Sequence, residues 1–218
     1  QVLFYKSHDL KAWDFLSAFG AGSPHHGRPG AEEWECPDLF PLPVDGGPAA
    51  IRCVLVANVN PGGVAGGSGG QYFVGEFDGV RFHSDAPVEE PSWLDWGRDC
   101  YASVSFSNVP DGRAIIIGWM NNWDYANALP THPWRSSMTL ARELRLTTCG
   151  SLVRLVQQPV LPAPGGERPT AAPGRVPGGP FELHGPGVPL PDAVPGQAQV
   201  IEAEILPGPA GQVAFHLL

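Results

Sequence analysis

Residues 34–40, which read WECPDLF, place the carboxylate of Glu35 between an aromatic ring and a proline. An aromatic neighbour excludes water from a carboxyl group and thereby favours its protonated form. A carboxyl group that keeps a proton near neutral pH can act as a general acid in the cleavage of a glycosidic bond. Glu35 is therefore a candidate general acid, although a glutamate is more often simply solvated at the protein surface.

A second candidate is the segment 118–127, GWMNNWDYAN, in which an apolar run ends in a loop rich in tryptophan and amides. Tryptophan faces stack on sugar rings, and the amides of Asn121 and Asn122 can hydrogen-bond to hydroxyl groups. Together with Trp119, these amides could form a sugar subsite. The same pattern fits a tightly packed structural loop equally well, so both interpretations stay open at this point.

Other patterns give no indication of a metal, a cofactor or a serine nucleophile. The glycine-rich run 62–70 lacks the Lys-Ser/Thr ending of a phosphate-binding loop and is predicted to be a flexible surface loop. His25 and His26 are adjacent, and neighbouring histidines seldom share a face. No G-x-S-x-G segment occurs. The cysteines have neither zinc-ligand spacing nor the density of a disulfide framework: Cys36, Cys53, Cys100 and Cys149.

The composition excludes several classes of partner. The 218 residues carry a formal net charge of −9, and Lys6 and Lys11 are the only lysines. Such a chain has no basic surface that could neutralise a phosphate backbone, so nucleic acid is not an expected partner. No apolar run approaches the roughly 20 residues of a membrane span. A neutral polar ligand suits this balance best.

The hydrophobic pattern predicts an all-β fold, because 28 glycines and 25 prolines interrupt the chain too often for long helices. Asp78-Gly79 marks a hairpin, since both residues tolerate positive φ. Similar units near Trp13 and Gly150 lie about 66 and 71 residues away. This recurrence suggests propeller blades, with a β-sandwich or another all-β fold as the alternative. The predicted strands are 2–5, 13–16, 51–59, 71–76, 80–83, 101–106, 114–119, 138–146 and 152–156.

The composition changes after residue 158. Residues 159–196 are rich in proline, glycine and alanine and have little periodicity, which predicts a linker or a set of loops. Residues 200–206 alternate apolar and acidic side chains, and 213–218 form another short apolar stretch. Two strands do not make a stable sandwich unaided, so residues 197–218 are predicted to begin a second β domain.

Four stretches resemble glycoside hydrolase family 32, which includes levanases, inulinases and invertases. They are residues 34–40, 60–79, 95–102 and 117–135, and the last, with GWMNNWDYANALPTHPWR, is the most specific. The resemblance implies a five-bladed β-propeller followed by a β-sandwich. Residues 1–158 would then be about the last three blades, 159–196 a linker and 197–218 the start of the sandwich. It also implies a secreted enzyme that needs no cofactor and cleaves levan, inulin or sucrose with retention.

The resemblance assigns roles to individual residues. Glu35 matches the family's acid/base within its Glu-Cys pair, so Cys36 is expected beside the substrate. Trp119 matches a wall of the subsite for the terminal fructosyl ring, with Asn121 next to it. Asp99 and Tyr101 are expected at the rim of the pocket. Cys100 departs from the family, which usually has phenylalanine at this position.

Two family motifs have no counterpart in the sequence. The aspartate nucleophile sits in a W-M-N-D-P-N-G-type segment, and a second aspartate sits in an Arg-Asp-Pro motif; neither occurs here, and both normally precede the Glu-Cys pair. Retention requires two carboxyl groups about 5–5.5 Å apart. The sequence therefore predicts a fragment that is inactive by itself. The alternatives are a non-catalytic fructan-binding propeller and a fructosyltransferase of the same fold.

Overall fold

The computed structural model describes residues 1–20, 33–87, 90 and 92–160. Their regular structure is almost entirely β, with one short 3-10 turn at Ala126–Ala128, so the all-β prediction is confirmed. The described residues contain no helix long and apolar enough to cross a membrane. The strands are β1 Val2–Lys6, β2 Asp14–Phe19, β3 Glu33–Pro43, β4 Ile51–Asn60, β5 Gly69–Phe77, β6 Phe82–Ser84, β7 Ser92–Trp93, β8 Tyr101–Ser105, β9 Ala114–Met120, β10 Ser137–Met138, β11 Arg142–Cys149 and β12 Leu152–Pro159.

These strands form one hairpin and two larger antiparallel sheets. β1 pairs with β2; the second sheet has the order β3-β4-β5-β6, and β7 also pairs with β5. In the third sheet β8, β9, β11 and β12 follow one another, and β10 pairs with the end of β9. Each larger sheet thus contains four strands in chain order, starting from β3 or β8. This is the up-and-down arrangement of a propeller blade.

Two of the three hairpins predicted from turn residues take equivalent places in the larger sheets, and the third, β1–β2, forms the separate two-stranded sheet. The hairpin β5–β6, closed by Asp78 and Gly79, ends the second sheet, and β11–β12 ends the third. The Asp78 carboxylate accepts backbone hydrogen bonds from Val80 and Arg81, which delays the second strand until Phe82. The recurrence in sequence therefore corresponds to a repeat of sheets.

One predicted strand is interrupted. The alternating run 138–146 gives the short β10 and the separate β11, with Thr139 between them. The Thr139 N–H donates to the Gly118 carbonyl oxygen at 2.9 Å, and the Thr139 hydroxyl accepts from the Gly118 N–H at 3.0 Å. A threonine side chain thus takes one position of the backbone ladder, which periodicity alone does not reveal.

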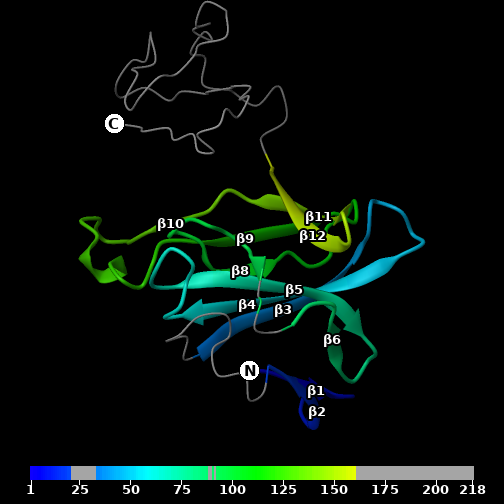
Figure 1. Cartoon of the computed structure of the whole chain (residues 1–218). Helices are drawn as coiled ribbons and strands as arrows, with labels where there is room; N and C mark the ends of the chain where they lie inside the picture. Colours follow the sequence, from blue (N-terminus) through cyan, green and yellow to red (C-terminus); the bar gives the residue numbers. More distant parts are fainter. Residues whose placement is uncertain (21–32, 88–89, 91, 161–218) are drawn as a thin grey trace, which may run out of the picture. The chain divides into compact units, whose positions relative to one another are not determined.

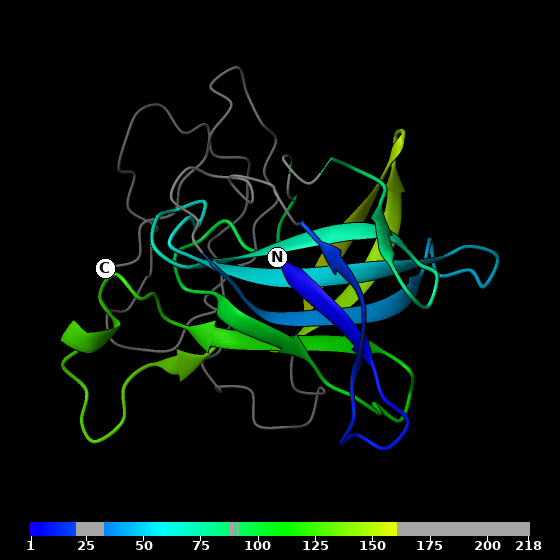
Figure 2. The same ribbon diagram turned by 90° about the horizontal axis from the view of Figure 1, so that it is seen from below.

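The central sheet, β3 to β6, is covered on both faces (Figure 1). One face packs against the β8–β12 sheet, and the shared core includes Val54, Val56, Tyr72, Leu144 and Leu146. The opposite face packs against the β1–β2 hairpin, which crosses the cyan strands in Figure 2. That second core is rich in aromatic residues: Phe4, Phe19, Trp34, Phe73, Phe77 and Phe82.

The expected linker at 159–196 and the expected sandwich segment at 197–218 lie outside the described residues, apart from Pro159 and Val160. The same holds for His25 and His26.

Candidate active site

Glu35 lies near the start of β3, and its carboxylate faces the neighbouring sheet. Its Oε2 accepts a hydrogen bond from the hydroxyl of Tyr101, the first residue of β8. Tyr101 is buried, with 3% of its surface exposed, whereas Glu35 is solvent-accessible. The two side chains meet because β3 and β8 are the first strands of adjacent sheets and lie in contact. The site thus has a carboxylate that is anchored at one oxygen and open to a ligand.

The aromatic neighbour of Glu35 is not the one that its sequence suggests. Successive residues of a strand point to opposite faces, so Trp34 turns away from Glu35. Its ring lies 5.9 Å from that of Phe19 and 5.5 Å from that of Phe73, inside the second core. The expectation that Trp34 shields Glu35 is therefore wrong, and Tyr101 supplies the aromatic contact instead.

A β-bulge follows Glu35 directly. Glu35 pairs with Asn58 and Asp38 with Val56, so β3 contains one residue more than β4 in this interval. Cys36 has a positive φ of 45°, and Pro37 has no N–H to donate to a ladder. Bulges of this kind occur next to active sites, where they redirect side chains. Because of the extra residue, Glu35 and Asp38 both face β8.

Asp38 uses this orientation to connect the two sheets. Its Oδ2 accepts a hydrogen bond of 2.6 Å from the backbone N–H of Ser105 in β8. A carboxylate that accepts from a backbone N–H makes a strong, charge-assisted bond. This contact fixes β8 beside β3 on the far side of the bulge from Glu35.

The thiol of Cys36 is exposed beside the carboxylate. Partial desolvation raises the pKa of this thiol, and the charge of Glu35 raises it further. Cys36 is therefore a neutral thiol at neutral pH and adds no second anion next to Glu35. Burial likewise raises the pKa of Cys100, whose sulfur lies 3.4 Å from the Ser103 hydroxyl. All four cysteines are free.

Aromatic rings continue outward from Tyr101. Trp119 in β9 pairs directly with Tyr101, and their ring centroids are 6.3 Å apart. The ring of Trp123 follows at 5.0 Å from that of Trp119 and is 48% exposed. Trp119 itself is half-buried. Residues directly opposite on paired strands share one face, so this row forms an aromatic wall beside Glu35.

The two amides after this strand hold the loop together. Asn121 is 1% exposed; its amide donates to the Ser136 hydroxyl, and its oxygen accepts from the Asn122 N–H. The side-chain nitrogen of Asn122 lies within hydrogen-bond distance of the carbonyl oxygens of Gly66, Ser68 and Arg98. For the amides, the geometry therefore favours the packed-loop interpretation over direct contact between Asn121 and a sugar.

The hydrogen bonds from Asn122 to Gly66 and Ser68 show that the prediction for the glycine-rich run 62–70 is wrong. This segment is packed, not a free surface loop: its turn is closed by hydrogen bonds from the Gly62 and Gly63 N–H groups to the Gly67 carbonyl oxygen, at 2.9 and 2.8 Å. A methyl group added at Gly67 would lie 1.9 Å from the Asn122 amide oxygen. Glycine is required here because the Asn122 side chain fills that space.

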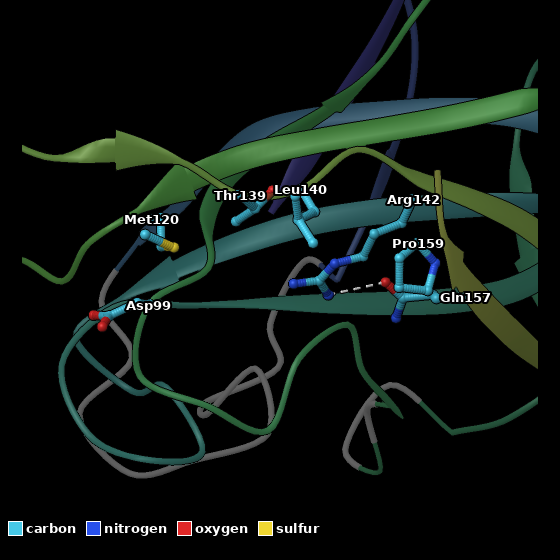
Figure 3. A pocket seen from close by; sticks show the side chains of 7 residues that line it. All are labelled: Asp99, Met120, Thr139, Leu140, Arg142, Gln157 and Pro159. Atoms are coloured by element: carbon cyan, nitrogen blue, oxygen red, sulfur yellow. Dashed lines mark hydrogen bonds between the residues drawn. The ribbon is translucent and has the colours of Figure 1, made fainter. Parts of the chain in front are cut away.

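Asp99 lines an open hollow of about 480 Å³ that Figure 3 shows in close-up. Asp99 and Met120 lie at one end of it, and Arg142 and Gln157 lie at the other. The Asp99 carboxylate accepts a hydrogen bond from the Tyr125 hydroxyl. Arg142 forms an ion pair of 2.7 Å with Asp95, so its charge is already compensated. The described residues contain no cluster of side chains suited to holding a metal ion.

Three residues that build this site act in ways that the sequence motifs do not indicate. Asn58, Asp38 and Asn122 act through backbone groups that lie far away in sequence. Asn58 gives one usable signal, since it is an amide within the otherwise apolar run 53–59. A buried amide needs hydrogen-bond partners, so such a residue predicts a polar connection without identifying its other end.

Comparison with known proteins agrees with the all-β fold. Residues 1–159 match the family model described as glycosyl hydrolases family 32 N-terminal domain. The chain is 49% identical over 162 residues to the levanase of Bacillus subtilis strain 168, covering 73% of this chain and 23% of the levanase. It is 45% identical over 166 residues to the extracellular exo-inulinase of Aspergillus niger, covering 73% and 30%.

Among solved structures, the exo-inulinase of Aspergillus awamori matches with a TM-score of 0.65 and 43% identity. The match covers 72% of this chain and 31% of that enzyme. The chain thus spans 23–31% of the length of these relatives. The match confirms that the two sheets and the hairpin are part of a β-propeller, and the chain belongs to glycosyl hydrolase family 32.

Proposed function

We propose that this chain forms the acid/base half of the active site of a secreted, retaining β-fructofuranosidase that hydrolyses levan, inulin or sucrose. The observation that carries the proposal is the anchored carboxylate of Glu35, which accepts a hydrogen bond from Tyr101, whose ring in turn lies 6.3 Å from that of Trp119. The relatives named levanase and exo-inulinase support a fructoside substrate. The name of the extracellular exo-inulinase supports secretion.

In the proposed reaction Glu35 acts twice. It first protonates the glycosidic oxygen as the bond to the leaving sugar breaks, while a carboxylate nucleophile takes the fructosyl group. Deprotonated Glu35 then removes a proton from the water that hydrolyses the fructosyl-enzyme. The nucleophile belongs to the W-M-N-D-P-N-G-type segment, which these 218 residues do not contain. It is therefore proposed to come from a part of the protein outside this sequence.

The side chain of Tyr101 has a defined part in this scheme. Its hydroxyl donates to Oε2 of Glu35 and so leaves Oε1 as the oxygen that can carry the transferable proton. The proposed reaction uses only these side chains, a second carboxylate and water, with no metal or organic cofactor.

The direct test is an assay of the full-length protein, meaning the complete gene product that contains residues 1–218. Fructose release from levan, inulin and sucrose is expected, with one preferred substrate. In dilute methanol, methyl β-fructofuranoside is the expected product, because retention preserves the β configuration. Binding of these sugars without release of fructose would contradict the proposal and favour the non-catalytic alternative. Fructosyl transfer to sugar in preference to water would identify a transferase.

Replacing Trp119 by alanine in the full-length protein is expected to lower kcat/KM for fructosides by about 1–3 kcal/mol in transition-state free energy. The change removes the half-buried ring that stands between Tyr101 and Trp123. Steady-state kinetics with sucrose and inulin measure the effect. The matched control is Trp134→Ala, which removes a tryptophan that is 70% exposed and lies outside the first hairpin. An unchanged kcat/KM in a natively folded Trp119→Ala variant would exclude this ring from the site.

A further inference from the structure

A second bulge follows Tyr101, in the same relative place as the first. Tyr101 pairs with Trp119 and Val104 with Ile117, so β8 contains one extra residue in this interval. Ala102 has a positive φ of 50°, as Cys36 does after Glu35. The two hydrogen-bonded side chains thus each precede a left-handed residue in a bulge. Their contact depends on how these two bulges are placed relative to each other.

Asn58, in β4, connects the two bulges. Its side-chain nitrogen donates toward the carbonyl oxygens of Cys36 at 3.3 Å and Glu35 at 3.5 Å. Its side-chain oxygen accepts from the Ser103 N–H, also at 3.3 Å. The residue is 0% exposed, so water does not compete for these groups. One buried amide therefore holds the backbone on both sides of the Glu35–Tyr101 hydrogen bond.

The space around Ser103 leaves little room for other arrangements. A methyl group added at Gly118 would lie 2.4 Å from the Ser103 hydroxyl and 3.2 Å from the Tyr101 carbonyl oxygen. Ser103 is itself 1% exposed. The second bulge is thus packed tightly against β9 on one side and bonded to Asn58 on the other, so a change in Asn58 acts mainly on the first bulge and on Glu35.

We infer that Asn58 is a positioning residue for the acid/base: it fixes the distance and direction of the Glu35 carboxylate relative to the Tyr101 hydroxyl. This role rests on the proposed function of Glu35. The side-chain hydrogen bonds that the structure gives Asn58 all go to backbone groups of the bulges, and the residue is 0% exposed, so it acts through Glu35 and does not touch a substrate. Misplacing a catalytic group by about 1 Å can cost on the order of 100-fold in rate.

The test is Asn58→Asp in the full-length protein. Aspartate has nearly the same shape and can still accept from the Ser103 N–H, but an ionised carboxylate has no hydrogen to donate to the carbonyls of Glu35 and Cys36. We expect kcat for sucrose or inulin to fall about 10–100-fold with KM changed less than about 3-fold. An aryl fructoside, whose leaving group needs little protonation, should lose less in its first chemical step.

Two comparisons distinguish a role of Asn58 in positioning Glu35 from a role in stabilising the fold alone. Asn122→Asp changes another fully buried amide that binds backbone carbonyls, but in the loop away from Glu35. It is expected to lower stability and to affect both substrate types equally. A crystal structure of Asn58→Asp is expected to show the Glu35–Tyr101 hydrogen bond broken. Asn58→Ala removes all three contacts without adding a charge and serves as the second variant.

The outcomes are distinct. Equal losses on both substrate types, or an intact Glu35–Tyr101 hydrogen bond in the variant, would overturn the positioning role. Failure of both Asn58 variants to fold would also overturn it, because Asn58 would then be a structural residue. If the wild-type protein releases no fructose, the proposed function fails, and the crystal structure of the variant alone decides whether Asn58 sets the geometry of Glu35.

Discussion

Replacing Glu35 by glutamine in the full-length protein is expected to slow the hydrolysis of sucrose or inulin by about 10²–10⁴-fold, the usual contribution of general acid–base catalysis. Glutamine keeps the shape of the side chain and an oxygen that can accept from the Tyr101 hydroxyl. It cannot deliver a proton to a leaving oxygen. Folding should therefore be preserved while the chemical step is lost.

The leaving group determines whether Glu35→Gln slows mainly the formation or mainly the hydrolysis of the fructosyl-enzyme. With an aryl fructoside, formation of the fructosyl-enzyme needs little protonation, so a rapid burst of the aryl product is expected. Slow turnover follows, because Glu35 is also the base that activates water. Stopped-flow measurements of product release resolve the two phases. The control is Glu76→Gln, which removes a carboxylate that is 65% exposed and paired with Arg52. Equal losses for both substrate types in the first step would show that Glu35 is not the acid.

Residues 1–218 expressed alone are expected to release no measurable sugar from levan, inulin or sucrose. A single proton donor cannot form a fructosyl-enzyme intermediate, since that step needs a second carboxylate. Reducing-sugar assays against the full-length protein measure the difference. Turnover by the 218-residue chain that Glu35→Gln abolishes would contradict this expectation and place a nucleophile within the sequence.

The same preparation is expected to melt over a broad temperature range. The described part of the chain exposes large apolar side chains on its first hairpin, among them Tyr5, Trp13 and Phe15, each about half exposed at 48%, 55% and 58%. A propeller closes by packing its first blade against its last, and apolar area beyond a few hundred Å² is unusual on a soluble monomer. A sharp thermal transition from a monomer would contradict this second expectation.

Much of the fold could be predicted from the sequence because its signals are local. Alternating runs and the Asp78-Gly79 turn predicted β5 and β6 and the hairpin between them, although β6 begins at Phe82. The break between β10 and β11 could not be predicted, because it depends on Thr139 meeting Gly118. Such a contact joins residues that are distant in sequence, and periodicity carries no information about it.

In the candidate site, too, the residues with local sequence signals could be predicted and the long-range contacts could not. Glu35 and Trp119 were identified from the residue pattern and Tyr101 from the family resemblance, and the structure brings these three residues together. The orientation of Trp34 was predicted wrongly, because a shielding role was inferred from adjacency in sequence and strand geometry separates adjacent side chains. The amides of the loop resemble ligand-binding groups in sequence, and only their backbone partners show that they are occupied within the protein.

In the bulge between Glu35 and Asp38, the number of residues matters more than the identity of the two middle residues, Cys36 and Pro37. Trp34 and Leu39 pack in the core beside the hairpin, while Glu35 and Asp38 face β8. With one residue fewer between Glu35 and Asp38, the alternation of the strand would turn the side chains on one side of the deletion to the opposite face of the sheet. Substitutions at the exposed Cys36 should be absorbed locally, whereas a single-residue deletion or insertion between Glu35 and Asp38 would exchange a charged side chain with an apolar one across the sheet.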